Sequence, residues 1–105
     1  MNEKLDLLVI GAGACGMTAA IAAHDAGGAV AIVEKRATPG GNSSLSTGSI
    51  PGAGSRFQVA AGINDSPERM IADLETTAGK HDADHLTALI ARECGPLCEW
   101  LINDL

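Results

Sequence analysis

Apolar and polar residues alternate in blocks that predict a strand, a helix and a second strand near the start of the chain. Residues 5–10, LDLLVI, are a short run rich in Leu, Val and Ile, which is typical of a buried strand. Residues 15–26, CGMTAAIAAHDA, have high helix propensity and stop at the pair Gly27 and Gly28. The run AVAIV at 29–33 predicts a second strand. Together they predict a βαβ unit, in which the two strands must be parallel.

The periodicity disappears between Thr38 and Gly54, where Gly, Ser, Pro, Asn and Thr prevail. We expect a long loop there, and a long ordered loop in a compact domain is usually functional. The pair Gly40 and Gly41 permits positive φ and a nest of backbone N–H donors. The loop is therefore a candidate binding surface.

A helix is predicted to begin after this loop. Ser66 is a good N-cap residue, and Pro67 suits the first helical position. The apolar residues at helical spacing, which would form its buried stripe, are Met70, Ile71 and Leu74.

A further helix is predicted to start near Asp84. Pro96 should kink or break it, because proline has no N–H to donate to the carbonyl of Arg92. The apolar residues expected on one buried face of this helix are Leu86, Leu89, Ile90 and Cys94.

Composition and charge limit the classes of protein to which this chain can belong. The length of 105 residues suits one domain, and the net charge of −6 argues against nucleic-acid binding, which needs clustered Lys and Arg. No apolar run approaches the length of a membrane span. The chain has three cysteines, Cys15, Cys94 and Cys98. Their odd number and their spacing do not fit a framework of disulfide bonds, so we expect a reducing, cytoplasmic compartment.

Two weaker motifs are set aside. The sequence CGPLC at 94–98 differs from a CGPC redox motif by an inserted leucine, and we expect two small buried thiols on successive helices. His81 and His85 have no evident third and fourth ligand, so no metal site is predicted.

Gly11, Gly13 and Gly16 form a G-x-G-x-x-G pattern between the first strand and the helix. The first glycine of such a pattern permits a tight turn, the second lets a pyrophosphate approach the backbone, and the third lets helix and strand pack closely. Free N–H groups from Ala14 to Gly16 would carry the diphosphate charge. Glu34, 18 residues after Gly16, would accept hydrogen bonds from an adenosine ribose.

The glycine pattern does not separate FAD from NAD, but the segment after Glu34 favours FAD. The stretch PGGNSSLSTG at 39–48 has the bare backbone and short polar side chains needed to pass under a ribityl chain and along a flavin edge. An NAD-binding Rossmann oxidoreductase stays open as an alternative, as does a non-catalytic nucleotide-binding fragment.

The chain resembles the amino-terminal part of the fumarate reductase and succinate dehydrogenase flavoprotein family, which includes urocanate reductases and 3-ketosteroid dehydrogenases. The resemblance is carried by VIGAGACGMTAAIAAHDAG, VEK, PGGNSSLSTGSIPGAGSRFQ and GINDSPERM. It implies an α/β fold, the N-terminal βαβ part of a Rossmann-like FAD-binding domain, followed by a long Gly/Ser loop and helices. Residues 1–105 would be the N-terminal part of a single FAD-binding domain and a fragment of a longer protein, because two parallel strands are too few for a stable doubly wound sheet.

The resemblance also implies which residues contact the cofactor. Cys15 would contact FAD through its backbone amide, Glu34 would bind the adenosine ribose, and Lys35 matches a basic residue often found after that acid. The residues that would line the flavin are Asn42, Ser43, Gly48 and Ser49. The full set of predicted cofactor-binding residues is Gly11, Gly13, Ala14, Cys15, Gly16, Glu34, Lys35, Gly41, Asn42, Ser43, Gly48 and Ser49.

Asn42 bears on how the flavin is attached. A histidine takes its place in the membrane-bound succinate dehydrogenase branch and bonds covalently to the flavin, so the resemblance implies non-covalent FAD here. The family moves a hydride between flavin N5 and a carbon of a C=C or C–C bond. We therefore expect an FAD-dependent oxidoreductase when full length, with a small carboxylate or enoate substrate and an electron donor or acceptor as partners. The family's catalytic arginine lies beyond residue 105, so no catalytic residue is nominated and the isolated segment should be inactive.

Overall fold

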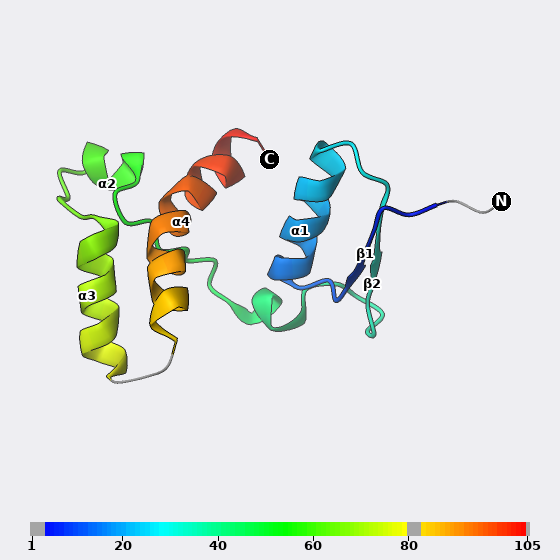
Figure 1. Ribbon diagram of the computed structural model, residues 1–105, viewed down its shortest axis with the longest axis horizontal. Coiled ribbons are helices and arrows are strands. Elements are labelled where there is room, and N and C mark those ends of the chain that lie inside the picture. The colour runs from blue at the N-terminus through cyan, green and yellow to red at the C-terminus, as the bar shows by residue number, and fades with distance from the viewer. Residues whose placement is uncertain (1–3, 80–82, 105) are drawn as a thin grey trace. The chain divides into compact units, whose positions relative to one another are not determined.

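The computed structural model describes residues 4–79 and 83–104. The chain divides into two compact units, Met1–Gly48 and Ser49–Leu105, which are described separately below. The first unit holds the strands and the second is helical, so the chain as a whole is of the α/β class (Figure 1).

The first unit begins with a strand, a helix and a second strand. These are β1 (Leu7–Ile10), α1 (Ala14–Asp25) and β2 (Val30–Val33). The strands are parallel, with Leu7 opposite Val30 and Ile10 opposite Val33, which confirms the predicted pairing. Both strands are shorter than the apolar runs that predicted them.

The expectation that β1 is a buried strand is wrong. Only Val9 is partly buried, and Ile10 has 84% of its surface exposed. Neighbouring residues of a strand point to opposite faces, and α1 can cover only one face of a sheet that has two strands in the described residues. The apolar run therefore predicted the strand correctly and its burial incorrectly.

The segment after β2 is not wholly irregular. Residues Gly41–Leu45 form a short 3₁₀ helix, η1, inside the stretch expected to be a loop. Gly40 precedes it with φ +120°, and a Cβ at that position would lie 2.9 Å from the Cβ of Ser44. Glycine is thus required where the chain turns into η1, because other residues rarely adopt this φ and none has room.

The second unit contains α2 (Arg56–Ala60), α3 (Pro67–Ala78) and α4 (Asp84–Asn103). The predicted start of α3 is confirmed, because the Oγ of Ser66 accepts a hydrogen bond from the N–H of Arg69 at 3.3 Å. The N–H of Glu68 and then the hydroxyl of Ser66 hold the pKa of the Glu68 carboxyl below its ordinary value. The predicted apolar stripe of α3 is partly buried.

Helix α4 meets one expectation and corrects another. It continues through Pro96, and Figure 1 shows its ribbon bending, so of the two predicted outcomes, a kink or a break, the structure shows the kink. Its buried residues are Ala91, Cys94 and Gly95. Of the four residues predicted on the buried face, Cys94 is buried as expected, whereas the three large ones, Leu86, Leu89 and Ile90, are exposed.

Close approach of backbone explains the small buried face of α4. A Cβ on Gly95 would lie 3.0 Å from the carbonyl oxygen of Ala53, and Ala91 is 0% exposed. Small residues let the segment before α2 lie against the helix, and that packing selects this face rather than the leucine-rich one. It also supports the helix across Pro96, where one backbone hydrogen bond is lost.

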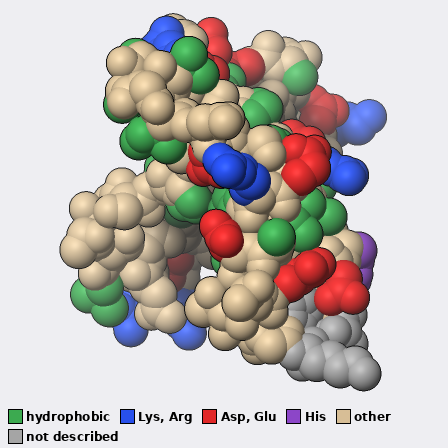
Figure 2. All heavy atoms as spheres, turned by 90° about the vertical axis from the view of Figure 1, so that its left-hand side faces the viewer, with side chains coloured by type: hydrophobic (Ala, Val, Ile, Leu, Met, Phe, Trp, Pro, Cys, Tyr) green, Lys and Arg blue, Asp and Glu red, His purple; other side chains and the backbone are tan. Residues whose placement is uncertain are grey.

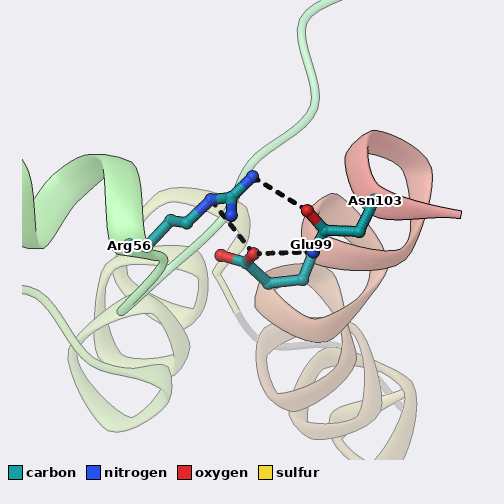
Figure 3. Close-up of polar contacts among 3 residues, drawn as sticks. All are labelled: Arg56, Glu99 and Asn103. Atoms are coloured by element: carbon teal, nitrogen blue, oxygen red, sulfur yellow. Dashed lines mark hydrogen bonds and ion pairs between the residues drawn. The ribbon is translucent and has the colours of Figure 1, made fainter.

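Polar contacts tie α2 to the end of α4 (Figure 3). The Nε of Arg56 lies 3.1 Å from the Oε2 of Glu99, and the same guanidinium donates to the Oδ1 of Asn103 at 3.2 Å.

Apolar side chains also reach the surface, where Figure 2 shows them among acidic and basic ones. No helix within the described residues has both the length and the apolar character needed to cross a membrane.

Candidate functional site

The glycine pattern forms the turn between β1 and α1. Gly11 has φ +105°, and its N–H donates to the carbonyl of Val33 at 2.8 Å, which joins the turn to the end of β2. Gly13 is the N-cap of α1. The turn therefore lies at the carboxyl ends of both parallel strands, where open α/β sheets bind their ligands.

Gly16 and Gly13 are glycines for different reasons. A Cβ on Gly16 would lie 1.9 Å from the carbonyl oxygen of Gly11, so helix and turn pack too closely for any side chain. Gly13 has φ −80°, and a Cβ there would meet only ordinary contacts at 3.6 and 3.8 Å. The fold itself does not require glycine at position 13. An approaching phosphate group would require it, so the turn fits a bound diphosphate.

The amino-terminal end of α1 presents backbone donors. The N–H of Ala14 donates to the Oγ of Ser43 at 3.1 Å, and the N–H of Met17 donates to the carbonyl of Gly13 at 3.0 Å. Within the described residues, the N–H groups of Cys15 and Gly16 have no recorded acceptor. Unpaired N–H groups at the positive end of a helix favour an anion.

Glu34 follows β2 and reaches back to this turn. Its Oε2 accepts the N–H of Ala12 at 2.8 Å, and its Oε1 accepts the N–H of Arg36 at 2.9 Å. These two amides, that of Ala12 first, hold the pKa of the Glu34 carboxyl below its ordinary value. The side chain is partly exposed, and each carboxylate oxygen keeps a further lone pair with which to accept a ligand hydroxyl.

A hollow of about 380 Å³ lies beside Glu34. Its lining residues are Ile10, Gly11, Val33, Glu34 and Lys35. Two apolar side chains and one carboxylate give this hollow the character of a ligand site, in which apolar walls hold a ring and few polar groups orient it.

Part of the glycine-rich loop lies directly on the turn. The N–H of Gly40 donates to the carbonyl of Ala12 at 2.7 Å, and a Cβ on Gly41 would lie 3.9 Å from the Cα of Gly13. Ser43 joins them through its bond to Ala14. The predicted set of site residues omitted Ala12 and Gly40, although the sequence had marked Gly40 and Gly41 as part of a candidate binding loop.

The other predicted loop residues are placed less centrally. Asn42 is exposed on η1, and Gly48, with φ +82°, ends the first unit. Ser49 is the first residue of the second unit. The contacts of these three residues with a cofactor stay predictions.

The cysteines near the end of the chain lie on one helix, not on two as expected. Cys94 is buried, with its Sγ 3.7 Å from the Sδ of Met70, whereas Cys98 is partly buried and faces the carbonyl oxygen of Pro51 at 3.7 Å. Both are free thiols. His81 lies outside the described residues, so its pairing with His85 is not described.

Comparison with known proteins identifies relatives. The family model of the FAD binding domain matches residues 6–104. An NADH:fumarate oxidoreductase of Klebsiella pneumoniae strain 342 is 39% identical over 103 residues, which cover 96% of this chain and 11% of the relative. A urocanate reductase of Eggerthella lenta is 37% identical over 103 residues, covering 97% of this chain and 17% of the relative.

Two solved structures are also similar to this chain. The open conformation of a flavocytochrome c3 fumarate reductase aligns with a TM-score of 0.86 and 33% identity, covering 95% of this chain and 18% of that one. A 3-ketosteroid-Δ4-(5α)-dehydrogenase from Rhodococcus jostii RHA1 aligns with a TM-score of 0.85 and 28% identity, covering 97% and 21%.

The chain thus spans less than a quarter of the length of these relatives. The match along nearly the whole chain confirms the predicted resemblance and the predicted cofactor, FAD, over the nicotinamide alternative. The chain belongs to the FAD binding domain family, among the fumarate reductase-like flavoproteins.

Proposed function

We propose that this chain is the FAD-binding segment of an oxidoreductase that acts on a CH–CH or C=C bond of a small carboxylate or enoate. The observation that carries the proposal is the glycine turn. There the N–H groups of Cys15 and Gly16, which have no acceptor among the described residues, and the carboxylate of Glu34 lie at the same end of two parallel strands. The similarity to reductases named for fumarate and urocanate supports the substrate class.

The first unit would hold the adenosine diphosphate half of FAD in a Rossmann-like manner. The N–H groups of Cys15 and Gly16 would bind the diphosphate, and Gly13 would let it approach the backbone. Glu34 would accept the ribose hydroxyls, and Lys35 would lie at the rim of the hollow beside them. The remaining predicted contacts come from the loop, at Gly41, Asn42, Ser43, Gly48 and Ser49.

The flavin would be bound without a covalent link. Asn42 stands where the membrane-bound succinate dehydrogenase branch has the histidine that bonds to the flavin. Its side-chain amide is not a nucleophile, and it is exposed on η1. FAD in the bound state supplies hydride transfer to the substrate through N5. The chain's own task is then to bind and orient it.

No residue of this chain is proposed as catalytic. Arg56 is engaged with Glu99 and Asn103, and the side chain of Arg69 donates to the carbonyl of Asn64. These contacts give both arginines structural roles. The substrate, the electron donor or acceptor and the acid that protonates the product would be met by other parts of the protein. Cysteine usage supports a reducing compartment such as the cytoplasm.

Denaturing the purified protein and recording the visible spectrum of both fractions tests the proposal. A flavin spectrum in the supernatant, identified as FAD by chromatography, is expected. Colour that stays with the precipitate would mean covalent flavin and would contradict the role of Asn42. Activity is tested on the full-length protein that contains this chain, by the oxidation of a reduced viologen dye with fumarate, urocanate or acrylate as acceptor. No turnover of any of these acceptors by the flavin-loaded full-length protein would reject the substrate class.

A further inference from the structure

A group of sulfur atoms lies where α3 packs beside α4 (Figure 1). The thiol of Cys94 in α4 donates to the thioether sulfur of Met70 in α3, and the two sulfur atoms are 3.7 Å apart. Cys98 follows Cys94 by four residues in the same helix, so its thiol lies on the same face, one turn further along. The stretch CGPLC thus brings two thiols to a face of α4 that a third sulfur atom contacts.

The distance between Cys94 and Met70 suits a shared metal ion. A sulfur ligand lies about 2.3 Å from a metal ion of the size of zinc. Two sulfur atoms 3.7 Å apart both reach an ion at that distance, with an angle of about 107° between the two bonds. The ion would take the place of the thiol hydrogen, which leaves as a proton when a cysteine binds a metal.

Cys98 is placed to supply a third sulfur ligand. Its Sγ contacts the carbonyl oxygen of Pro51 at 3.7 Å, a weak hydrogen bond that rotation about one side-chain bond releases. Side chains four residues apart on a helix have Cβ atoms about 5–6 Å apart, so such a rotation directs the thiol of Cys98 towards Cys94. A Cβ on Gly52 would lie 3.1 Å from the Sγ of Cys98, so glycine at this position leaves room for the sulfur.

A hollow of about 290 Å³ in the second unit gives access to the cluster. Its lining includes Met70, and it also includes Pro51 and Gly52, the two residues beside the thiol of Cys98. Cys94 itself is only 5% exposed. The hollow therefore borders both ends of the sulfur cluster and provides the entry path that a buried metal site needs.

The donor atoms determine the class of metal ion. In residues 4–79 and 83–104, no three or more His, Cys, Asp or Glu side chains form a group that could hold a metal ion. Thiolate and thioether sulfurs are soft ligands that favour Cu(I), whereas zinc usually takes four ligands from Cys, His and carboxylates. We infer that Cys94, Met70 and Cys98 form a site for one Cu(I) ion, bound through three sulfur atoms. The inference is independent of the proposed function, because none of these residues belongs to the proposed FAD site.

Anaerobic titration with Cu(I) of the full-length protein that contains this chain tests the inference, with affinity measured by competition with a coloured Cu(I) chelator. We expect one ion that Cys94→Ser and Cys98→Ser bind more than about a hundredfold more weakly, because loss of a ligand should cost more than loss of a residue that only orients one. Met70→Leu keeps the size of the side chain without its sulfur and should weaken binding roughly tenfold or more. Met17→Leu, in the first unit, is the matched control and should leave the affinity unchanged.

X-ray absorption by the bound copper identifies its neighbours. Three sulfur atoms at about 2.3 Å are expected, and Met70→Leu should reduce them to two. A wild type that leaves all copper on the chelator overturns the inference, as does copper held equally by the wild type and the three variants. Nitrogen or oxygen neighbours in place of the third sulfur would also overturn it.

Thermal melting separates loss of the site from loss of the fold. An ion that binds only the folded state stabilises it, so Cu(I) should raise the melting temperature of the wild type and not that of Cys98→Ser. A wild-type melting temperature that saturating Cu(I) does not change would contradict the site. If Cys94→Ser does not fold, because its hydroxyl would be buried, Cys98→Ser and Met70→Leu test the same cluster.

Discussion

Glu34 and Ala12 are 22 residues apart in the sequence, and the Oε2 of Glu34 accepts the backbone N–H of Ala12 at 2.8 Å. The bond ties the end of β2 to the glycine turn. Glu34 therefore has a structural role in addition to the ribose contact proposed for it, and the same carboxylate shapes the turn and faces the hollow beside it. A change at Glu34 should affect stability before any cofactor is added.

The first prediction concerns stability and pH. The pKa of Glu34 is lowered in the folded protein from its ordinary value of 4.5, so its carboxylate stabilises the fold fully above that value. The contribution is lost as the pH falls through the lowered folded pKa. Glutamine has one acceptor oxygen and cannot serve both amides in the same way. Glu34→Gln should thus melt at a lower temperature than the wild type near pH 7.

Melting curves of both proteins from neutral pH to about pH 3 check this prediction, because the difference should shrink below the ordinary carboxyl pKa. Arg36 donates through its backbone, so Arg36→Ala keeps both bonds to the carboxylate and is a suitable control. A difference that stays constant across the whole range would show that ionisation of Glu34 is not its cause.

The second prediction separates two glycines of one pattern. Gly16→Ala would place a Cβ 1.9 Å from the carbonyl oxygen of Gly11, and should lower the free energy of unfolding by about 3 kcal/mol. Gly13→Ala has room at 3.6 Å, and should change that free energy by at most about 1 kcal/mol.

Gly13→Ala should have a larger effect on the affinity for FAD than its small effect on stability suggests. Gly13→Ala should weaken FAD roughly tenfold or more, because its methyl group occupies the approach to the backbone. Chemical denaturation and FAD titration of the same samples give both quantities. A Gly13→Ala protein that binds FAD like the wild type would mean that the diphosphate lies elsewhere.

The third prediction contrasts an exposed ion pair with a buried small residue in the second unit. The side chains of Arg56 and Glu99 are 50% and 34% exposed, so Arg56→Ala should cost less than about 1 kcal/mol of unfolding free energy. Ala91 is 0% exposed in α4, and Ala91→Leu should cost about 1–3 kcal/mol by overpacking. Equilibrium urea unfolding measures both, and a costlier Arg56→Ala would mean that the polar contacts of Figure 3 dominate this packing.

Local signals predicted the elements of this fold well. The cap at Ser66 and the stop at Gly27 depend on neighbours a few residues away, so a sequence suffices to place them. Burial is different, because it depends on what packs against an element. Periodicity on α4 favoured the face of Leu89, yet the packing of Ala53 against Gly95 selected another face.

The sequence predicted what kind of site this is, but only some of the contacts within it. The spacing of the glycines and of Glu34 was enough to predict nucleotide binding. Neither the bond from Ala12 to Glu34 nor the bond from Ala14 to Ser43 follows from spacing, because each joins segments more than twenty residues apart. The bond to Ser43 also depends on the conformation of Gly40 and η1, which a sequence without periodicity does not specify.

The last prediction uses Cys15 as a natural probe of the site. Its thiol is exposed near the amino-terminal end of α1, whereas Cys94 is buried and Cys98 is partly buried. In the cofactor-free protein, iodoacetamide should therefore alkylate Cys15 first. FAD bound at the turn should slow this reaction in proportion to its occupancy, by roughly a hundredfold at a hundred times the Kd. Riboflavin lacks the diphosphate and should protect poorly at the same concentration.

Mass spectrometry of the alkylated peptides measures each cysteine separately, and Cys94 serves as an internal reference for local unfolding. Protection at Cys15 alone would place the ligand over the amino-terminal end of α1. This is the position favoured by the N–H groups of Cys15 and Gly16, which lack an acceptor among the described residues. Equal protection of all three thiols would reflect a general stabilisation of the fold by FAD. An unchanged rate at Cys15 under saturating FAD would contradict the proposed position of the diphosphate.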